Sequence, residues 1–446
     1  MNMIGLNGDQ GSGRTVAFSF RGIGEALLII AVVGYPLVTI PATIFDLPSR
    51  WVTVPYRLLV VVLASVLLLW ALNRKGRRLK IAWWMLPFGL FWGLYLLRLG
   101  IDTIDSPIHL SRPLWEYWAY ALGTGMLPAL GLAVASGEIL VSRMRRVMTA
   151  ALAFTLVGLI LIGPGLDSIG DGRFYLNPFL NPISGAHYAV MFFLVALWFV
   201  VVGRDRSVTG ISVLVLATVC MFWVQTLSAS RGPLVVLGLG VGLIAATSFG
   251  VRRMFRGGVA IVLSVLAFLG FQALLPFRFR PMAALERLIL TGDRIGGDQE
   301  ARVSLWASAW EQFLQSPLLG AGLEDPSFPG YPHNIIVEAF LSTGILGGTC
   351  MAFLILLTLG QATYWVLVDD QKGWLGLVGI QMLIWALFSG ALYARPETWA
   401  MMGLILGWKS PTVTPQDGRR GARPRTYSEG TGPDLPRSLP RSVGEH

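Results

Sequence analysis

Charged residues are scarce in this chain. They make up 13% of its 446 residues, whereas hydrophobic residues make up 54%, and the mean hydropathy is +0.63. A typical soluble globular domain has about 25% charged residues. The composition therefore excludes an ordinary soluble domain and indicates a polytopic membrane protein.

Cysteine, histidine and metal-binding motifs are also scarce. The chain has two cysteines and four histidines. Cys220 and Cys350 both fall in apolar runs, so we expect small core residues and no disulfide. The sequence contains no Walker-type phosphate loop, HExxH motif or Cys/His cluster. It therefore predicts neither a cofactor nor a metal site, and the adjacent acids Glu324 and Asp325 are the one weak alternative.

Long apolar runs are plentiful. A membrane span needs about 20 apolar residues, and the chain offers about twelve such runs. They lie at 23–45, 53–72, 81–99, 114–136, 147–166, 185–203, 208–227, 232–250, 258–275, 343–366, 374–393 and 397–408. The predicted fold is all-α, a transmembrane bundle of about twelve spans with a large periplasmic loop that contains short amphipathic helices. The first run is too long for a cleavable signal, so we expect an uncleaved anchor.

Basic clusters recur at alternate ends of these runs, at 74–80, 143–146, 204–206 and 252–256. Such alternation is the positive-inside pattern of membrane proteins, so the net charge of +10 indicates topology and not nucleic-acid binding. We expect the basic tail to touch membrane lipids. The predicted organisation is a cytoplasmic leader 1–22, nine spans in 23–275, a periplasmic catalytic loop 276–342, three spans in 343–408, and a disordered cytoplasmic tail 409–446.

The 276–342 loop is the only long polar interval between apolar runs. Asp298 is a suitable N-cap for a helix that ends at about Gln315. Five large apolar residues share one face of that helix: Val303, Trp306, Trp310, Phe313 and Leu314. This stripe favours packing or interface anchoring over a sugar-binding platform.

Arginines and a histidine gather in the predicted external segments. Arg231 lies in a tight turn after the seventh run, where the positive-inside rule does not explain it; a snorkelling arginine is the alternative. Arg302 is predicted to lie in the first turn of the loop helix, where the macrodipole favours acids, so a bound anion or an acidic neighbour is expected. His333 opens the next apolar helix and is either a general base or a turn or cap residue. Other loop arginines are Arg278, Arg280, Arg287 and Arg294.

A second external loop precedes the sixth run. It carries Arg173, two Asn-Pro steps and His187. Asn-Pro marks turns, so this segment is predicted to be a tight loop, with the lining of a substrate cleft as the alternative.

Guanidinium groups pair bidentately with phosphate oxygens, and a neutral histidine can accept a proton. The external residues therefore suit displacement of a phosphorylated leaving group by a hydroxyl. In a membrane, the matching substrate is a lipid-linked diphosphate.

Three motifs in the region 210–365 resemble the O-antigen ligase and O-antigen polymerase family. They are Ser230-Arg231-Gly232, the Arg302-x-x-x-Trp306 pair followed by Pro317-Leu-Leu-Gly320-x-Gly322, and His333-Asn334 followed after nine positions by Gly344-Ile-Leu-Gly347. The last is the most specific.

The resemblance implies an inverting, metal-independent glycosyltransferase of the bacterial inner membrane. Its donor would be a polyprenyl-diphosphate-linked glycan, and its acceptor a sugar of lipid A-core or of another lipid-linked glycan. By position, Arg231 and Arg302 would bind the diphosphate, with Arg173 as a further substrate-binding candidate. His333 would activate the acceptor hydroxyl, and Asn334 would orient a neighbour or a sugar.

Ligation and polymerisation remain open alternatives. Polymerases of this family are described with an arginine, ten positions and a glycine, and here Phe313 stands where that glycine would follow Arg302. The departure favours a ligase or an exopolysaccharide-type relative. A flippase or transporter is less favoured because ionisable residues are rare inside the spans, and a non-catalytic envelope assembly factor is the third alternative.

Overall fold

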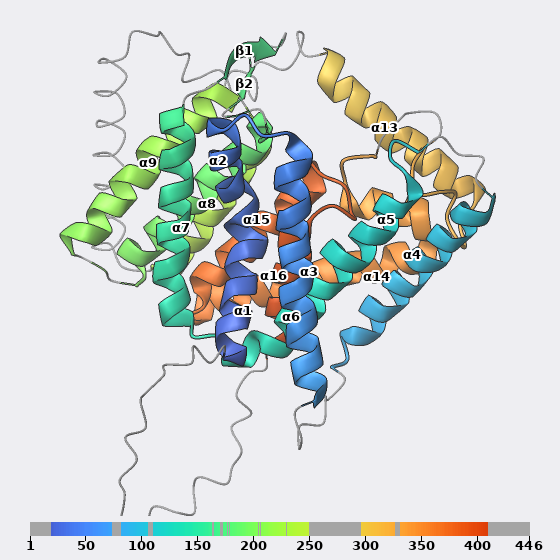
Figure 1. Ribbon diagram of the computed structural model, residues 1–446, viewed down its shortest axis with the longest axis horizontal. Coiled ribbons are helices and arrows are strands. Elements are labelled where there is room, and N and C mark those ends of the chain that lie inside the picture. Colours follow the sequence, from blue (N-terminus) through green and yellow to red (C-terminus); the bar gives the residue numbers. More distant parts are fainter. Residues whose placement is uncertain are drawn as a thin grey trace, which may run out of the picture. The chain divides into compact units, whose positions relative to one another are not determined.

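The computed structural model describes twelve stretches of the chain, namely 19–73, 82–105, 110–162, 165–169, 173–175, 177, 179–203, 205, 207–228, 230–248, 296–325 and 331–408. The regular secondary structure of these stretches is helical apart from one short hairpin (Figure 1), which confirms the predicted all-α class. The predicted ninth span, the tail 409–446 and the arginines at 278, 280, 287 and 294 lie outside the described residues.

The N-terminal half contains helices and the hairpin. Its helices are α1 (Phe20–Ile29), α2 (Tyr35–Ile44), α3 (Ser49–Asn73), α4 (Met85–Asp105), α5 (Leu114–Tyr120), α6 (Leu127–Ala135), α7 (Val141–Ile162) and α8 (Pro182–Val201). The antiparallel strands β1 (Gly165–Ile169) and β2 (Arg173–Tyr175) pair Gly165 with Tyr175 and Ile169 with Arg173. The sequence did not predict this hairpin.

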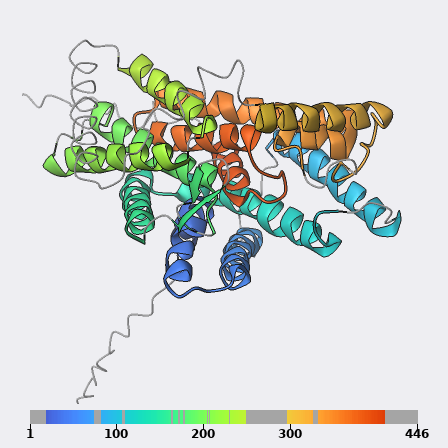
Figure 2. The same cartoon turned by 90° about the horizontal axis from the view of Figure 1, so that it is seen from above.

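The C-terminal half is helical where it is described. Its helices are α9 (Val208–Ser228), α10 (Gly232–Thr247), α13 (Gly296–Gln315), α14 (Ile335–Val368), α15 (Gly373–Phe388) and α16 (Pro396–Gly407). Helix α13 packs along α14 (Figures 1 and 2).

Eight described helical segments are long and apolar enough to cross a membrane. They correspond to the first seven predicted spans and the tenth: Phe20–Ile44, Ser49–Asn73, Met85–Ile104, Leu114–Glu138, Val141–Ile162, Pro182–Val201, Val208–Ser228 and Ile335–Val368. Helices α10, α15 and α16 are shorter. The multi-pass class is thus confirmed, while the count of about twelve stays a prediction.

Two of these segments contain a π-helical turn next to a proline. The turns are Ile30–Gly34, before Pro36, and Ala121–Met126, before Pro128. Proline has no N–H to donate to the carbonyl four residues earlier, and that residue falls within the π turn in both cases. A shorter 3-10 turn, Ser136–Glu138, ends the second segment.

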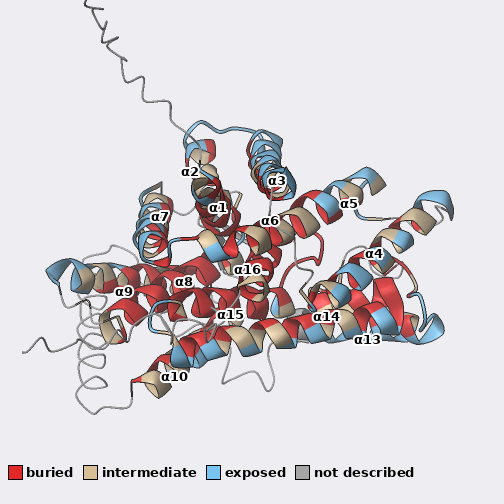
Figure 3. Ribbon diagram, turned by 90° about the horizontal axis from the view of Figure 1, so that it is seen from below, coloured by how far each residue is buried: buried red, intermediate tan, exposed pale blue. Residues whose placement is uncertain are grey.

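Burial divides the helices into a central and a peripheral group. Within an 18-residue apolar stretch of each helix, 83% of the residues are buried in α8 and 28% in α3. Helix α15 is buried along nearly its whole length (Figure 3). An amphipathic stripe suits a helix with one face toward lipid, whereas all-round burial suits a central helix. Helices α8 and α15 therefore form the centre against which the site is built.

Candidate active site

The turn at Pro317–Gly322 interlocks with a kink in α14. The Ile345 amide donates to the Pro317 carbonyl at 2.7 Å, and the Ala321 amide donates to the Leu341 carbonyl at 2.8 Å. At the kink, Gly344 has φ 68° and ψ −165°, which no helical residue adopts. Two of the family-like motifs therefore form one structural unit.

Glycine is required on both sides of this interlock. Gly320 has φ +78°, and a Cβ there would lie 2.4 Å from the Leu341 carbonyl oxygen. A Cβ on Gly344 would lie 2.2 Å from the Leu318 carbonyl oxygen. Both contacts are with backbone, which cannot move aside as a flexible side chain would. The motif glycines thus fix the first turns of α14 and the chain just before it.

His333 lies in that preceding chain and has φ 59°, a left-handed conformation that is uncommon for residues other than glycine. The turn is held on both sides. The Trp306 indole donates to the Pro332 carbonyl at 2.7 Å. The Asn334 side-chain oxygen caps α14 by accepting from the Ile336 and Val337 amides at 2.9 and 3.2 Å. The helix cap is therefore Asn334, and His333 projects from a fixed backbone.

A cavity of about 530 Å³ adjoins His333. It is lined by His333, Tyr331 and Leu305, by Arg112 just before α5, and by Glu116 in the first turn of α5. The Tyr331 and His333 rings are 4.5 Å apart. Burial raises the pKa of Tyr331, so its hydroxyl keeps its proton. We name this space the His333 cavity.

Buried acids hold the walls of the His333 cavity. Glu324 accepts from the Ser111 amide and hydroxyl, at 2.8 and 2.6 Å, and from the Tyr117 hydroxyl. Asp325 accepts from the Gln312 side chain. Glu324 thus joins the loop after α13 to the segment before α5, and both acids have structural partners. Among the described residues, no group of three or more His, Cys, Asp or Glu side chains could hold a metal ion.

The ion pair between Arg98 and Asp102 holds the same loop against α4. Its atoms are 2.7 Å apart. Arg98 donates to the Gly320 carbonyl at 3.2 Å, and Asp102 accepts from the Leu323 amide at 3.3 Å. These charges at the end of α4 are therefore structural.

Helix α13 brings Arg302 to the same region. The helix begins at Gly296, so the prediction that Asp298 caps it is wrong, and Arg302 lies in its second turn. The backbone of Arg302 is one turn before Trp306, which bonds to the His333 turn. The Arg302 side chain is outside the described part of the structure.

Only part of the apolar stripe on α13 packs against other elements. Trp310 and Phe313 pack against Phe340 of α14, with ring centroids 5.6 and 5.3 Å apart, whereas Val303 and Leu314 are exposed. Trp306 bonds to the His333 turn. The stripe therefore attaches α13 to α14, as the packing interpretation predicts.

Arg231 stands at the N-cap position of α10. Its neighbour Gly232 faces His187, whose Nε2 would lie 3.5 Å from a Cβ at Gly232. His187 is buried, its Nδ1 lies 2.7 Å from the Gln381 amide nitrogen, and its ring stacks on Trp385 at 4.8 Å. The Arg231 turn is thus set beside the start of α8 and the end of α15. Arg231 does not line the His333 cavity or the cavity described next.

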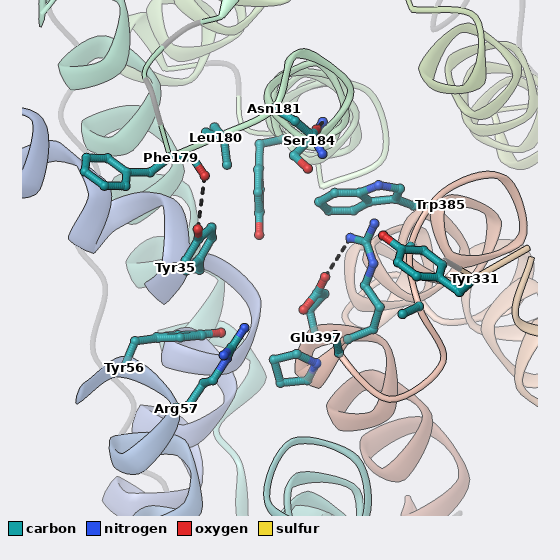
Figure 4. A pocket seen from close by; sticks show the side chains of 16 residues that line it. Tyr35, Tyr56, Arg57, Phe179, Leu180, Asn181, Ser184, Tyr331, Trp385 and Glu397 are labelled. Atoms are coloured by element: carbon teal, nitrogen blue, oxygen red, sulfur yellow. Dashed lines mark hydrogen bonds and ion pairs between the residues drawn. The ribbon is translucent and has the colours of Figure 1, made fainter. Parts of the chain in front are cut away.

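Tyr331 also lines a second cavity, of about 330 Å³ (Figure 4). Tyr35, Tyr56 and Arg57 line one side, and Tyr331, Trp385 and Glu397 line the other. Arg395 also lines it. We name this space the tyrosine cavity. Because Tyr331 lines both cavities, they adjoin at this residue.

The loop before α8 contributes to the tyrosine cavity. Phe179, Leu180, Asn181 and Ser184 line it, and Asn181 caps α8 by accepting from the Ser184 amide at 2.7 Å. This part of the loop therefore lines a cavity, and a substrate-binding role for it stays a prediction. Arg173 lies on β2, and its side chain is not described.

Sequence reasoning missed Arg57, Arg112 and Arg395, which line the two cavities. Arg112 and Arg395 stand just before helices α5 and α16, at ends that the predicted topology places outside. The argument that singled out Arg231, an arginine where the positive-inside rule expects none, applies to both. Arg57 lies inside α3 and inside the predicted span 53–72, where an ionisable residue is itself a signal of function.

The fold and the site together define a multi-pass helical membrane protein with a histidine beside two arginine-containing cavities. Residues 216–352 match the family model Wzy_C, described as O-Antigen ligase. This match covers part of the chain and confirms its resemblance to the O-antigen ligase and polymerase family. The matched stretch includes Arg231, Arg302, His333 and Asn334. A search of curated proteins found no match.

Proposed function

We propose that this protein is an O-antigen ligase-like glycosyltransferase of the bacterial inner membrane. It transfers a polyprenyl-diphosphate-linked glycan to an acceptor sugar hydroxyl on the periplasmic face. The observation that supports this most is His333, which lies within the matched family domain, in a left-handed turn fixed by Trp306 and Asn334 at the edge of a cavity.

His333 acts as the general base. It accepts the proton of the acceptor hydroxyl while that oxygen forms a bond to the anomeric carbon of the donor sugar. The bond from this carbon to the diphosphate oxygen breaks, and its electron pair leaves with the diphosphate. Attack opposite the leaving group inverts the anomeric configuration. A fixed backbone favours this role because a base must be held within hydrogen-bond reach of the proton that it abstracts.

Arginines stabilise the departing diphosphate. Arg231 and Arg302 are assigned to this role, with Arg173 and Asn334 as further substrate-binding residues. Guanidinium groups supply fixed charge and paired donors for phosphate oxygens, so the reaction needs no metal ion. The Asn334 side-chain oxygen already caps α14, so its contact with substrate would use the amide nitrogen.

The predicted topology is consistent with one external site. His333, Arg231, Arg112 and Arg395 stand at or near the ends of helices that the alternation of basic clusters assigns to the periplasmic face. A periplasm-dependent reporter inserted near Gly297 should be active. If a reporter inserted at this position instead indicates a cytoplasmic location, the orientation is overturned and with it the proposed site.

The glycan profile of cells that lack this protein tests the function. Accumulation of unligated lipid-linked polymer indicates the ligase, whereas single lipid-linked repeat units indicate the alternative, a polymerase of O-antigen or exopolysaccharide repeats. Phe313 packs against Phe340 at the position where an O-antigen polymerase of the family would have glycine, and this departure favours a ligase or an exopolysaccharide-type relative. Complementation with His333→Ala distinguishes an enzyme from an assembly factor, since an assembly factor would tolerate the substitution. A normal profile without the protein would refute the proposal.

A further inference from the structure

The tyrosine cavity is built almost wholly outside the family domain. Of its lining residues, only Tyr331 lies within 216–352. The His333 cavity, by contrast, takes His333, Tyr331 and Leu305 from that stretch. The shared domain thus supplies the reacting histidine, and the helices around it supply the neighbouring cavity. Such a division suits a cavity that recognises the substrate particular to this chain.

Arg57 brings a positive charge to the tyrosine cavity. Its Nη1 donates to the Tyr120 hydroxyl at 2.6 Å, and its guanidinium lies 4.3 Å above the Tyr120 ring. Tyr120 in turn donates to Glu116 at 2.9 Å, but Glu116 is already paired with Arg112 at 3.0 Å. Within the described stretches, no carboxylate forms an ion pair with Arg57.

The other charges of the cavity compensate one another. Arg395 pairs with Glu397 at 2.9 Å, donates to the Ser389 carbonyl at 2.7 Å and lies 4.0 Å above the Trp385 ring. The cavity therefore has one positive charge in excess, at Arg57. A partly buried guanidinium without a carboxylate partner favours an anionic ligand, because the ligand replaces the hydration that burial removes.

The tyrosine hydroxyls define what else the ligand must offer. Tyr35 donates to the Phe179 carbonyl at 3.0 Å, and Tyr56 donates to the Ala31 carbonyl at 3.3 Å. With their protons used in this way, both hydroxyl oxygens are left to accept hydrogen bonds from a ligand. A ligand that fits has hydroxyl groups to donate and an anionic group to accept from Arg57. An acidic sugar has both.

We propose that the tyrosine cavity binds the acceptor's sugar unit, and that this unit is acidic, with a carboxylate or phosphate that pairs with Arg57. This assignment rests on the proposed function, because it makes Tyr331 the boundary across which the acceptor presents its hydroxyl to His333. The volume of about 330 Å³ is near the lower end of the range of ligand pockets, about 300–1,000 Å³. It suits a short acceptor end and not a polymer.

Ligand-observed NMR on the detergent-solubilised full chain tests this proposal, with glucuronate, glucose 6-phosphate and glucose as probes. We expect at least one acidic sugar to bind at least about tenfold more tightly than glucose, the factor that one charge-assisted hydrogen bond supplies. Arg57→Gln should abolish this preference. Arg143→Gln is the matched control, since Arg143 is 61% exposed and pairs with Glu25. Equal binding of all three probes, or an acid preference that survives Arg57→Gln, would overturn the proposal.

Three further variants separate loss of the anion site from misfolding. Arg57→Lys keeps the charge and should keep part of the preference, whereas Tyr120→Phe removes the hydrogen bond to Arg57 and should leave the acid preference in place. His333→Ala should bind the acidic probe like the unaltered chain. If the Arg57-dependent preference is present but cells lacking the protein have a normal glycan profile, the proposed function fails and the anion site stands. If transfer occurs without the preference, the anion site fails alone.

Discussion

The two cavities that adjoin at Tyr331 differ in how their polar groups are held. In the His333 cavity, the backbone is fixed by glycines, an indole and an asparagine cap, and His333 projects from it in a strained conformation. In the tyrosine cavity, the side chains themselves are fixed, Tyr35 and Tyr56 by hydrogen bonds to backbone carbonyls and Arg395 by its ion pair with Glu397. A reacting side chain needs a rigid backbone and an accessible functional group, whereas a recognition site needs a rigid set of donors and acceptors. The difference therefore separates chemistry from recognition.

The largest expected effect comes from removing the base. General-base catalysis contributes about 10²–10⁴ in rate, so His333→Ala should reduce transfer by that factor while donor binding persists. Donor binding and turnover are measured side by side on the purified variant, with His446→Ala as a histidine control. If both fall together, His333 positions the diphosphate or supports the fold. Unchanged turnover would leave the His333 cavity without its assigned chemistry.

The next effect comes from the arginines of the family domain. Loss of one preorganised donor to developing charge costs about 10²–10³ in rate, so Arg231→Ala and Arg302→Ala should each reduce transfer by that factor. Arg302→Lys should restore only part of it because the bidentate fork is lost. Arg143→Ala is the control for loss of an exposed arginine. Full activity of Arg231→Ala would make Arg231 a snorkelling residue at the start of α10.

The sequence was informative wherever the signal was local. Apolar runs located eight helical segments long enough to span a membrane, and the histidine and glycine motifs marked the loop and helix that hold His333. What it could not show is contact across distance. The docking of Pro317 on Ile345 depends on two backbone segments that meet only in the fold. Arg57 and Arg395 line the same cavity although they lie far apart in the sequence, and no sequence periodicity predicts this.

A third prediction tests the interlock of the Pro317–Gly322 turn with the kink in α14, which fixes the backbone beside His333. Gly344→Ala introduces both a left-handed alanine and a Cβ against the Leu318 backbone. Backbone strain of this kind costs on the order of 1–3 kcal/mol, and the clash adds to it. We expect a lower melting temperature and weaker transfer. The acid preference of the tyrosine cavity should change less, because its lining comes mostly from other helices.

Gly360→Ala is the matched control for that substitution. Gly360 lies on the same helix α14, and nothing lies within 4 Å of the position of an added Cβ. Alanine in a helix is favoured over glycine by roughly 0.5–1 kcal/mol, so this variant should be at least as stable as the original. Equal stability of the two variants would show that the interlock does not need glycine.

The smallest expected effect is that of removing divalent metal ions. Glu324 and Asp325 are the acids nearest to the His333 cavity that sequence reasoning considered as ligands, and each already accepts hydrogen bonds, from Ser111 and Tyr117 and from Gln312. A carboxylate engaged in this way would have to give up these bonds to coordinate a cation, and the loop would lose its attachment to α5. We therefore expect EDTA to leave transfer by the purified chain unchanged, with added Mg²⁺ or Mn²⁺ giving no increase. Activity that falls with EDTA and returns with Mg²⁺ would show that the diphosphate is neutralised by a metal and not by arginine alone, and Glu324→Gln and Asp325→Asn would then identify the ligand.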